Sequence, residues 1–239
     1  MYTTTEAIVL QLHPYKDKSA VVKLYSGQMG LISCWVSSVH GKKSKTKSAI
    51  LQPLSIIKAE ISYRENSNMP QLKETSILVH TPGIPMSIEK SSLALFISEL
   101  LLRCLKESSP DIPLYSFISE AISLLDTTSE KCSNFHLVFL VRLCEHFGLL
   151  PHGNYSPQTP YFNLEESAYQ ANVPLHPHFL FPAESEFLSK LSSVPMQEFH
   201  SLIIPAALRK NILHGLLEYY RLHLGMPPLK SHLVLEEVL

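Results

Sequence analysis

Lysines and aromatic residues are interleaved along the first third of the chain, a combination suited to binding single-stranded nucleic acid. The cations would neutralise phosphates and release counterions, and the aromatic rings would stack on bases with little regard to sequence. The alternative is an ordinary lysine-rich surface around a core that holds the rings; Trp35, in mid-strand, fits either interpretation. The candidate residues are Tyr15, Lys16, Lys18, Lys23, Trp35, Lys42, Lys43, Lys45, Lys47 and Arg64.

The charge is divided unevenly between the two parts of the chain. Residues 1–80 carry a formal charge of +5 and residues 81–239 carry −6, although the total is only −1. This asymmetry indicates two units, of which the basic one is suited to polyanions. No run of roughly 20 apolar residues is present, and Met1–Glu6 lacks the layout of a signal peptide. A soluble cytoplasmic protein is therefore expected.

Motifs for catalysis are missing from the sequence. There is no glycine-rich phosphate loop, GxSxG, HExxH or CxxC pattern, so the sequence predicts no enzyme. The four cysteines are too far apart for a zinc knuckle and fit small buried side chains in a reducing compartment. His152, His176 and His178 are the best candidates for a metal site. They have no cysteine or carboxylate at ligand spacing, so ordinary loop histidines are the default expectation.

Five short strands are expected within the first 80 residues. Ala7–Leu12 is an apolar run, and Ser19–Tyr25 and Leu31–Val36 flank a glycine-containing turn typical of a hairpin. Residues 57–64 alternate between apolar and polar with a period of two, and Gln71–Val79 supplies the fifth strand. Five such strands favour a small closed barrel of the OB type, although a sandwich or an open sheet also fits.

From residue 81 the apolar residues recur at helical spacing. The predicted fold class is therefore α+β, with a five-stranded OB-type β-barrel over residues 1–80 and an α-helical domain over residues 81–239. Six prolines predict an irregular insertion at about 150–183 with a short hairpin, and the tail after Pro228 is expected to pack on the helices. The expected helices cover about Leu93–Cys104 (capped by Ser87), Tyr115–Leu125, Cys132–Phe147 (ended by Gly148), Glu184–Leu191 and Pro205–Leu224 (ended by Gly225).

Several short motifs occur in the same order as in the RecO family of bacterial DNA repair and recombination proteins, and the chain resembles that family from end to end. The N-terminal motifs are Ala7–Leu10, Tyr15–Val22, Gly30–Ile32, the basic loop Gly41–Lys47 and Leu51–Leu54. The C-terminal motifs are Leu208–Tyr220, His223–Gly225 and Leu229–Ser231.

The resemblance implies a recombination mediator of the RecFOR pathway. Such a protein binds single- and double-stranded DNA, anneals complementary strands, acts with RecR to help load RecA, and docks the C-terminal tail of single-stranded DNA-binding protein. It also implies association with the nucleoid during repair. Lys16, Lys18 and the loop lysines match the basic barrel surface of the family. Arg103, Arg142 and Arg209, on apolar helices, are candidates for contacting the acidic tail, and the alternative is that each is a solvated or paired helix residue.

One departure from the family concerns zinc. Many members carry a four-cysteine zinc module, whereas residues 150–180 contain no cysteine here, so neither zinc nor any other cofactor is expected. The Phe162–Glu166 segment is expected to keep the hairpin without a metal. Two other functions remain open: an adaptor whose OB barrel binds protein rather than nucleic acid, and a metal-dependent hydrolase that uses the three loop histidines.

Overall fold

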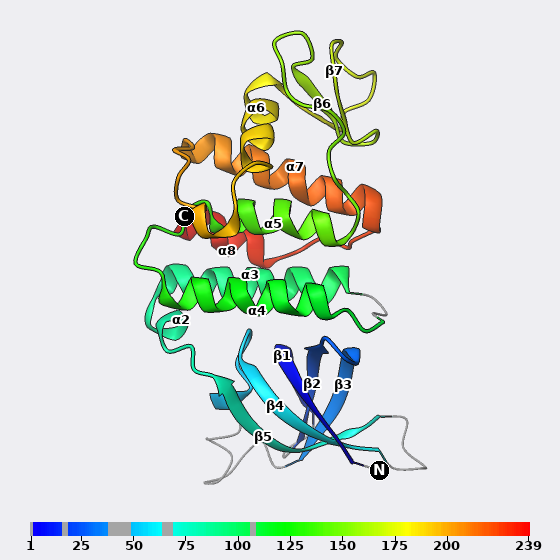
Figure 1. The fold of residues 1–239 in the computed structure, drawn as a ribbon, viewed down its shortest axis with the longest axis vertical. Coiled ribbons are helices and arrows are strands. Elements are labelled where there is room, and N and C mark those ends of the chain that lie inside the picture. The colour runs from blue at the N-terminus through cyan, green and yellow to red at the C-terminus, as the bar shows by residue number, and fades with distance from the viewer. Residues whose placement is uncertain (1, 16–18, 38–48, 64–68, 106–108) are drawn as a thin grey trace. The chain divides into compact units, whose positions relative to one another are not determined.

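The computed structural model describes residues 2–15, 19–37, 49–63, 69–105 and 109–239. The chain divides into two compact units, Met1–Thr127 and Thr128–Leu239. Among the described residues, the first contains the β-barrel and the helices that follow it up to Thr127, and the second contains the later helices and a small sheet (Figure 1).

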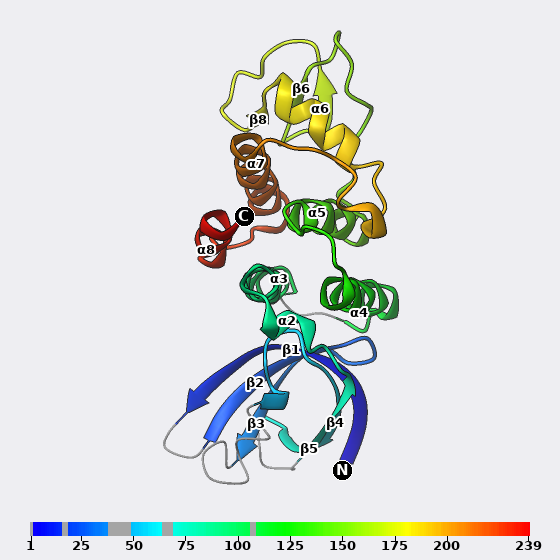
Figure 2. The same cartoon turned by 90° about the vertical axis from the view of Figure 1, so that its left-hand side faces the viewer.

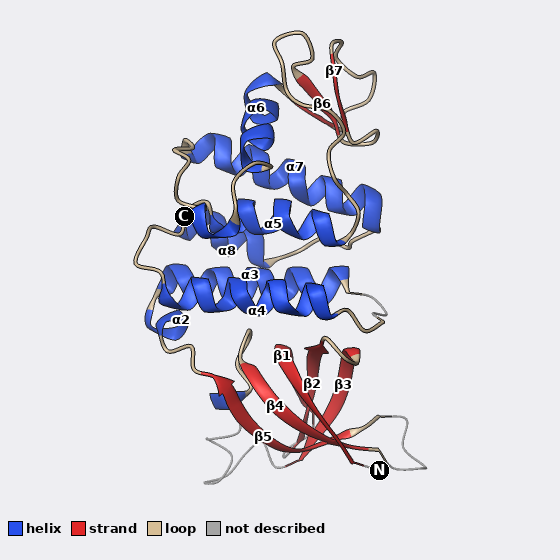
Figure 3. Cartoon of the chain, viewed as in Figure 1, coloured by secondary structure: helices blue, strands red, loops and turns tan. Residues whose placement is uncertain are grey.

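Five strands of the first unit close into a barrel in the order β1-β2-β3-β5-β4 (Figure 3). All neighbouring pairs are antiparallel except β3 and β5, which pair in parallel. The predicted α+β class with an N-terminal five-stranded sheet of OB type is confirmed. The strands are β1 (Tyr2–Tyr15), β2 (Ser19–Ser26), β3 (Gly30–Ser37), β4 (Ile56–Ser62) and β5 (Gln71–Val79).

Alternate residues of each strand fill the barrel interior, as the period of two requires. The buried cluster includes Ala7 and Val9 of β1, Val22 and Leu24 of β2, and Cys34 of β3. β1 is longer than its apolar run because its polar ends also pair, with β4 along Tyr2–Ile8 and with β2 along Ile8–Tyr15.

Helices α2 (Gly83–Met86), α3 (Ile88–Cys104) and α4 (Ile112–Thr127) complete the first unit, and α3 and α4 cross one end of the barrel (Figures 1 and 2). The predicted cap is confirmed, since the Ser87 Oγ accepts a hydrogen bond from the Lys90 N–H at 3.3 Å. α4 begins before its predicted start because Pro113 lies in its first turn, where a backbone N–H has no helical partner to lose.

The expected helical domain is shared between the two units. α2, α3 and α4 pack with the barrel in the first unit, and the helices that follow belong to the second. One contact that explains this packing is the Ser98 hydroxyl of α3, which donates a hydrogen bond to the Leu10 carbonyl of β1. The boundary predicted after residue 80 thus marks the end of the strands, whereas the compact units divide after Thr127.

The second unit contains α5 (Phe135–His146), α6 (Pro182–Leu191), α7 (Ala206–Leu224) and α8 (Ser231–Val238). α7 packs against α5 and α6 (Figure 1), and it ends at Gly225, whose φ of 57° is the left-handed conformation expected of a glycine terminator. The tail packs back as expected through buried Leu229 and Leu235, but it does so as a helix that was not predicted. None of the helices described is long and apolar enough to cross a membrane.

Candidate nucleic-acid interface

Trp35 lies on the outside of the barrel. Its neighbours in β3, Cys34 and Val36, are buried in the barrel core, so the Trp35 side chain points to the opposite face and is only half-buried. The Tyr15 ring, 48% exposed, meets it edge to face, with 5.1 Å between centroids and 71° between planes. The two rings form an aromatic pair on the outer surface.

A β-bulge places Tyr15 on that surface. The β1–β2 register shifts between Val9 and Gln11, which leaves Leu10 as the extra residue. Before the bulge the odd-numbered residues of β1 face the core, and after it Leu12 packs on the core instead. Without the extra residue, Tyr15 would point inward.

Lys23 shares the outer face with the aromatic pair. It lies between core residues Val22 and Leu24 and is directly opposite Gln11 and Ser33 on the neighbouring strands. Val21, two residues before Lys23 on β2, lies opposite both His13 and Trp35. The outer face of β1, β2 and β3, defined here by His13, Tyr15, Val21, Lys23 and Trp35, is a continuous surface with one cation and two exposed or half-exposed rings. His13 was missed as a candidate because only the bulge gives it this orientation.

The strand ends next to the lysine-rich segments lie at one end of the barrel. Tyr15 pairs with Ser19, and Ser19 with Ser37. Trp35 pairs with Gln71, and Gln71 with Ser62. The chain leaves or enters the described strands here, beside the aromatic pair. Seven candidates fall outside the described residues: Lys16, Lys18, Lys42, Lys43, Lys45, Lys47 and Arg64.

Two other tyrosines of the barrel differ in exposure. Tyr25 is fully buried, burial raises its pKa, and its hydroxyl donates to the Asp111 carbonyl at 3.3 Å. It is therefore a core residue. Tyr63 is 41% exposed and follows β4 at the same end as the aromatic pair, so it extends the set of rings available there.

The three candidate arginines have different surroundings. Arg103 is 3.8 Å from the Glu99 carboxylate on its own helix and is 42% exposed. Arg142 donates hydrogen bonds to the Leu191 and Ser192 carbonyls, at the end of α6. A cation at a helix C-terminus compensates the unpaired carbonyls there, so Arg142 has a structural task.

Arg209 lies beside a cavity. Its Nη1 donates to the Ile204 carbonyl at 2.9 Å and its Nη2 to the Leu239 carbonyl at 2.6 Å. The cavity has a volume of about 220 Å³, and its lining includes Leu213, Leu235 and the cation Lys210. Glu236 also lines the cavity, and its carboxylate is paired with Lys210 at 2.8 Å. Apolar walls beside the Arg209 cation are the features that suit an acidic peptide with a hydrophobic end.

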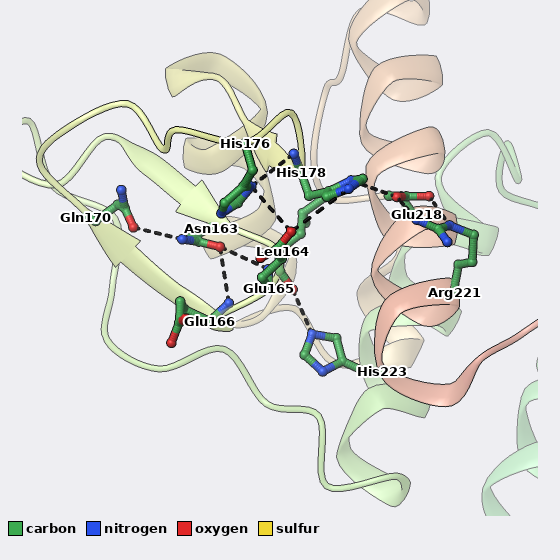
Figure 4. Close-up of polar contacts among 10 residues, drawn as sticks. All are labelled: Asn163, Leu164, Glu165, Glu166, Gln170, His176, His178, Glu218, Arg221 and His223. Carbon is green, nitrogen blue, oxygen red and sulfur yellow. Dashed lines mark hydrogen bonds and ion pairs between the residues drawn. The ribbon is translucent and has the colours of Figure 1, made fainter.

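The proline-rich insertion contains the predicted hairpin. β6 (Tyr161–Asn163) pairs with β7 (Ala168–Gln170) and with β8 (Phe179–Leu180). The Asn163 Oδ1 accepts the backbone N–H groups of Glu165 and Glu166 at 2.9 and 3.1 Å, and this fixes the turn (Figure 4).

Polar contacts tie this small sheet to α7. His178 lies 2.8 Å (Nδ1) from the Glu218 carboxylate and 3.9 Å (Nε2) from that of Glu165, and the His223 Nε2 is 2.7 Å from the Leu164 carbonyl (Figure 4). A hydrogen bond and the charge from Arg221, followed by His178, lower the pKa of Glu218. These side chains hold the hairpin in a segment whose sequence has no cysteine ligands.

The loop histidines are not assembled as a metal site in the described part of the chain. The His152 backbone N–H bonds the Ser167 carbonyl at 2.6 Å, and His152 does not join His176 and His178 in a group able to hold an ion. The hydrolase hypothesis thus has no support from the described residues.

A small closed barrel followed by helices and a three-stranded insertion defines an α+β protein of the OB class. The family model described as recombination protein O N terminal matches residues 1–80, and the one described as recombination protein O C terminal matches residues 86–233. This chain therefore belongs to the RecO family of DNA repair proteins.

Two proteins of known name are similar to this chain along its full length. The DNA repair protein RecO of Phocaeicola vulgatus is 34% identical over 239 residues, which cover 100% of this chain and 99% of that protein. The protein of the same name from Bacteroides fragilis is also 34% identical, with 100% and 99% covered. Among solved structures, an asparaginyl-tRNA synthetase of Entamoeba histolytica aligns with a TM-score of 0.28 and 12% identity, covering 68% of this chain and 35% of that chain.

Proposed function

We propose that this chain is a non-enzymatic recombination mediator that binds DNA on the outer face of β1, β2 and β3. The observation that carries the proposal is the Tyr15–Trp35 pair on the outside of the barrel, next to the strand ends that lead into the lysine-rich segments. Exposed rings beside clustered cations allow stacking on bases while phosphates are neutralised. Binding of this kind is indifferent to sequence, as a mediator requires.

The test is the fluorescence anisotropy of a labelled single-stranded oligonucleotide, titrated with protein at several salt concentrations. If about five lysines contact phosphates, the log–log slope of affinity against salt is roughly −3 to −4. Replacing Lys42, Lys43, Lys45 and Lys47 by Gln is expected to flatten the slope and to weaken binding of every sequence alike. A matched control replaces four exposed lysines of the second unit, Lys131, Lys190, Lys210 and Lys230.

Each outcome of this titration is informative. An unchanged slope in the loop variant, or an equal loss in the control variant, would remove the loop from the DNA site. Absence of any binding at low salt, with the fold intact, would favour the alternative in which the barrel is a protein-interaction adaptor. Binding of double-stranded DNA is measured in the same way with a duplex.

Membership of the family supports the later steps of the proposed activity. The chain would anneal complementary strands and, together with RecR, help to load RecA in the RecFOR pathway, in the cytoplasm at the nucleoid. Annealing makes and breaks no covalent bond, which agrees with a sequence without catalytic motifs. Strand annealing measured by energy transfer between labelled complementary oligonucleotides, with and without RecR, tests this step.

We further propose that the Arg209 cavity takes the C-terminal tail of single-stranded DNA-binding protein. Of the three candidate arginines, Arg209 is the one that lines this cavity, together with apolar walls and the Lys210–Glu236 ion pair. Replacing Arg209 itself would also remove the hydrogen bonds to Ile204 and Leu239, so a neighbouring position gives a cleaner test.

The variant Ala207→Glu places a negative charge on the cavity wall at an exposed position of the first turn of α7. An acid there suits the helix dipole, so the fold is expected to persist. Binding of a fluorescent acidic tail peptide is expected to weaken, whereas Ala183→Glu, in the first turn of α6, is expected to leave it unchanged. Equal affinity of both variants would place the tail elsewhere.

A further inference from the structure

His214, His232 and Glu236 form a cluster between two helices of the second unit. His214 lies on α7, and His232 and Glu236 lie four residues apart on α8, so that they share one face of that helix. One nitrogen of each imidazole and one carboxylate oxygen lie within 4.8 Å of one another. No other group of three such side chains in the described ranges is close enough to hold a metal ion.

The cluster also contains an unsatisfied buried atom. The Nδ1 of His232 is buried and has no hydrogen-bond partner, although the Glu236 carboxylate, only 10% exposed, belongs to the same group. Buried polar atoms are nearly always paired, and an exception calls for a ligand such as an ion or a water molecule. The His214 Nε2 already lies 2.5 Å from the Glu236 Oε1, so two donor atoms converge on one point.

We propose that His214, His232 and Glu236 bind one divalent transition-metal ion, for which zinc is the best chemical match. Two imidazoles and one carboxylate are a common zinc ligand set, and a fourth tetrahedral position remains for water. Calcium and magnesium prefer sites made of oxygen ligands only, which this cluster does not supply.

Lys210 is placed to orient the carboxylate ligand. Its Nζ lies 2.8 Å from the Glu236 Oε2, while the other oxygen, Oε1, faces His214. A hydrogen bond to the non-ligating oxygen fixes the direction of the ligating one. The Lys210 side chain is 56% exposed, so water screens the repulsion between its charge and the ion.

The ion would fasten α8 to α7. Leu235 is the buried residue of α8. The contacts described between the two helices include those of the Lys210 and His214 side chains with Glu236 and an edge-to-face contact of the His214 and His232 rings. A bound metal adds a cross-link between residues 214 and 232–236. The expectation of a zinc-free chain rests on the missing cysteines of residues 150–180, and this cluster lies outside that segment.

The test is a competition titration of chelator-stripped protein with zinc chloride, read with a chromophoric zinc indicator. The expected result is one zinc per chain. His214→Gln and Glu236→Gln are each expected to weaken binding by about tenfold or more, since loss of a ligand costs at least as much as loss of an outer partner. His214 is 51% exposed, so its variant is expected to fold, and far-ultraviolet circular dichroism confirms this.

The matched control removes another pair of histidines near carboxylates. His176→Gln/His178→Gln alters the contacts with Glu165 and Glu218 and is expected to leave zinc affinity unchanged. Zinc is also expected to raise the melting temperature of the parent protein but not of the His214→Gln variant. Absence of stoichiometric binding, equal affinity in all variants, or loss only in the control would overturn the proposal.

Discussion

At the scale of single residues, orientation decides what a side chain can do. Trp35, on β3, is a half-buried ring on the outside of the barrel. Tyr25, on the neighbouring strand β2, is fully buried against α4 and hydrogen-bonded to Asp111. Both are aromatic residues of the basic segment, yet only the first can offer a face to a base. The same reasoning separates Arg142, which donates to the carbonyls at the end of α6, from Arg209, which lines a cavity.

The variant Trp35→Ala tests the stacking role. Because the ring lies outside the core, its removal is expected to weaken single-stranded DNA binding by about 1–3 kcal/mol and to leave the melting temperature nearly unchanged. The control is Phe181→Ala, a 60% exposed ring of the second unit, for which no loss of affinity is expected. A large fall in melting temperature for Trp35→Ala would identify the ring as a packing residue instead.

The buried histidine His136 is expected to make the stability of the folded protein depend on pH. It is buried in α5, and burial together with the Arg209 charge lowers its pKa to about 3. In the unfolded chain the pKa is near 6.5, so below that pH the unfolded state binds a proton that the folded state does not. Stability is therefore lost as pH falls, by about 2 kcal/mol between pH 7 and pH 5.

Urea unfolding at the two pH values measures this effect. His136→Gln cannot titrate, so the variant is expected to lose less stability between pH 7 and pH 5 than the parent, whatever its stability at pH 7. His200→Gln, at an exposed position, is the control and should behave as the parent does. The same loss in the parent and in His136→Gln would assign the acid sensitivity to other groups.

At the scale of elements, close approach of backbone segments explains why α2, α3 and α4 stay together. The Asp126 Oδ1 accepts the Ile84 N–H at 2.8 Å, and the Asp126 carbonyl accepts the Lys90 Nζ at 2.7 Å. The first bond requires the end of α4 to lie against the start of α2, and the second requires it to lie against the start of α3. A Cβ on Gly83 would lie only 2.3 Å from the Asp126 carbonyl oxygen, so this position needs glycine.

Gly83→Ala is accordingly expected to destabilise the first unit by about 1–3 kcal/mol, the usual cost of forcing extra atoms into a packed contact. Equilibrium denaturation followed by tryptophan fluorescence is a suitable measurement, because Trp35, the one tryptophan, lies in that unit. Met86→Ala, at the 87% exposed end of α2, is expected to change stability by no more than about 0.5 kcal/mol. Equal stability of both variants would mean that the α4 end relaxes away from Gly83.

At the scale of the whole molecule, the chain combines a basic strand-rich part with an acidic helical part. Residues 1–80 carry +5 and residues 81–239 carry −6, so the DNA backbone is attracted to the first and repelled by the second. The proposed placement of DNA on the barrel follows this asymmetry, whereas the proposed peptide and metal sites of the second unit depend on local side chains such as Arg209 and His214.

Hydrogen exchange with and without a single-stranded oligonucleotide tests this placement of DNA. Protection on DNA binding is expected in β1, β2 and β3 of the first unit, and little change is expected in Thr128–Leu239. An oligonucleotide at a concentration too low for binding serves as the control. Protection confined to the second unit would contradict the assignment of DNA to the barrel.

Periodicity in the sequence was enough to predict the five strands and most helices, and the resemblance of short motifs indicated the family. Local patterns report on local geometry: alternation marks the strands, and Ser87 and Gly225 mark helix ends through their own side-chain and backbone chemistry. The motifs of the family are likewise read along the chain. Helix α8 was not predicted because it has only eight residues, about two turns, which is too short for a helical period to stand out.

Tertiary structure alone decided which residues meet. The extra residue, Leu10, reverses the face of the sheet to which each later side chain of β1 points, and so places Tyr15 beside Trp35. No pattern in the sequence predicts this bulge. The His214–His232–Glu236 cluster joins two helices across a turn, so its spacing matches no linear metal motif. In both cases the reason is the same: contacts between distant residues depend on register and packing, which are set by the whole fold rather than by neighbours along the chain.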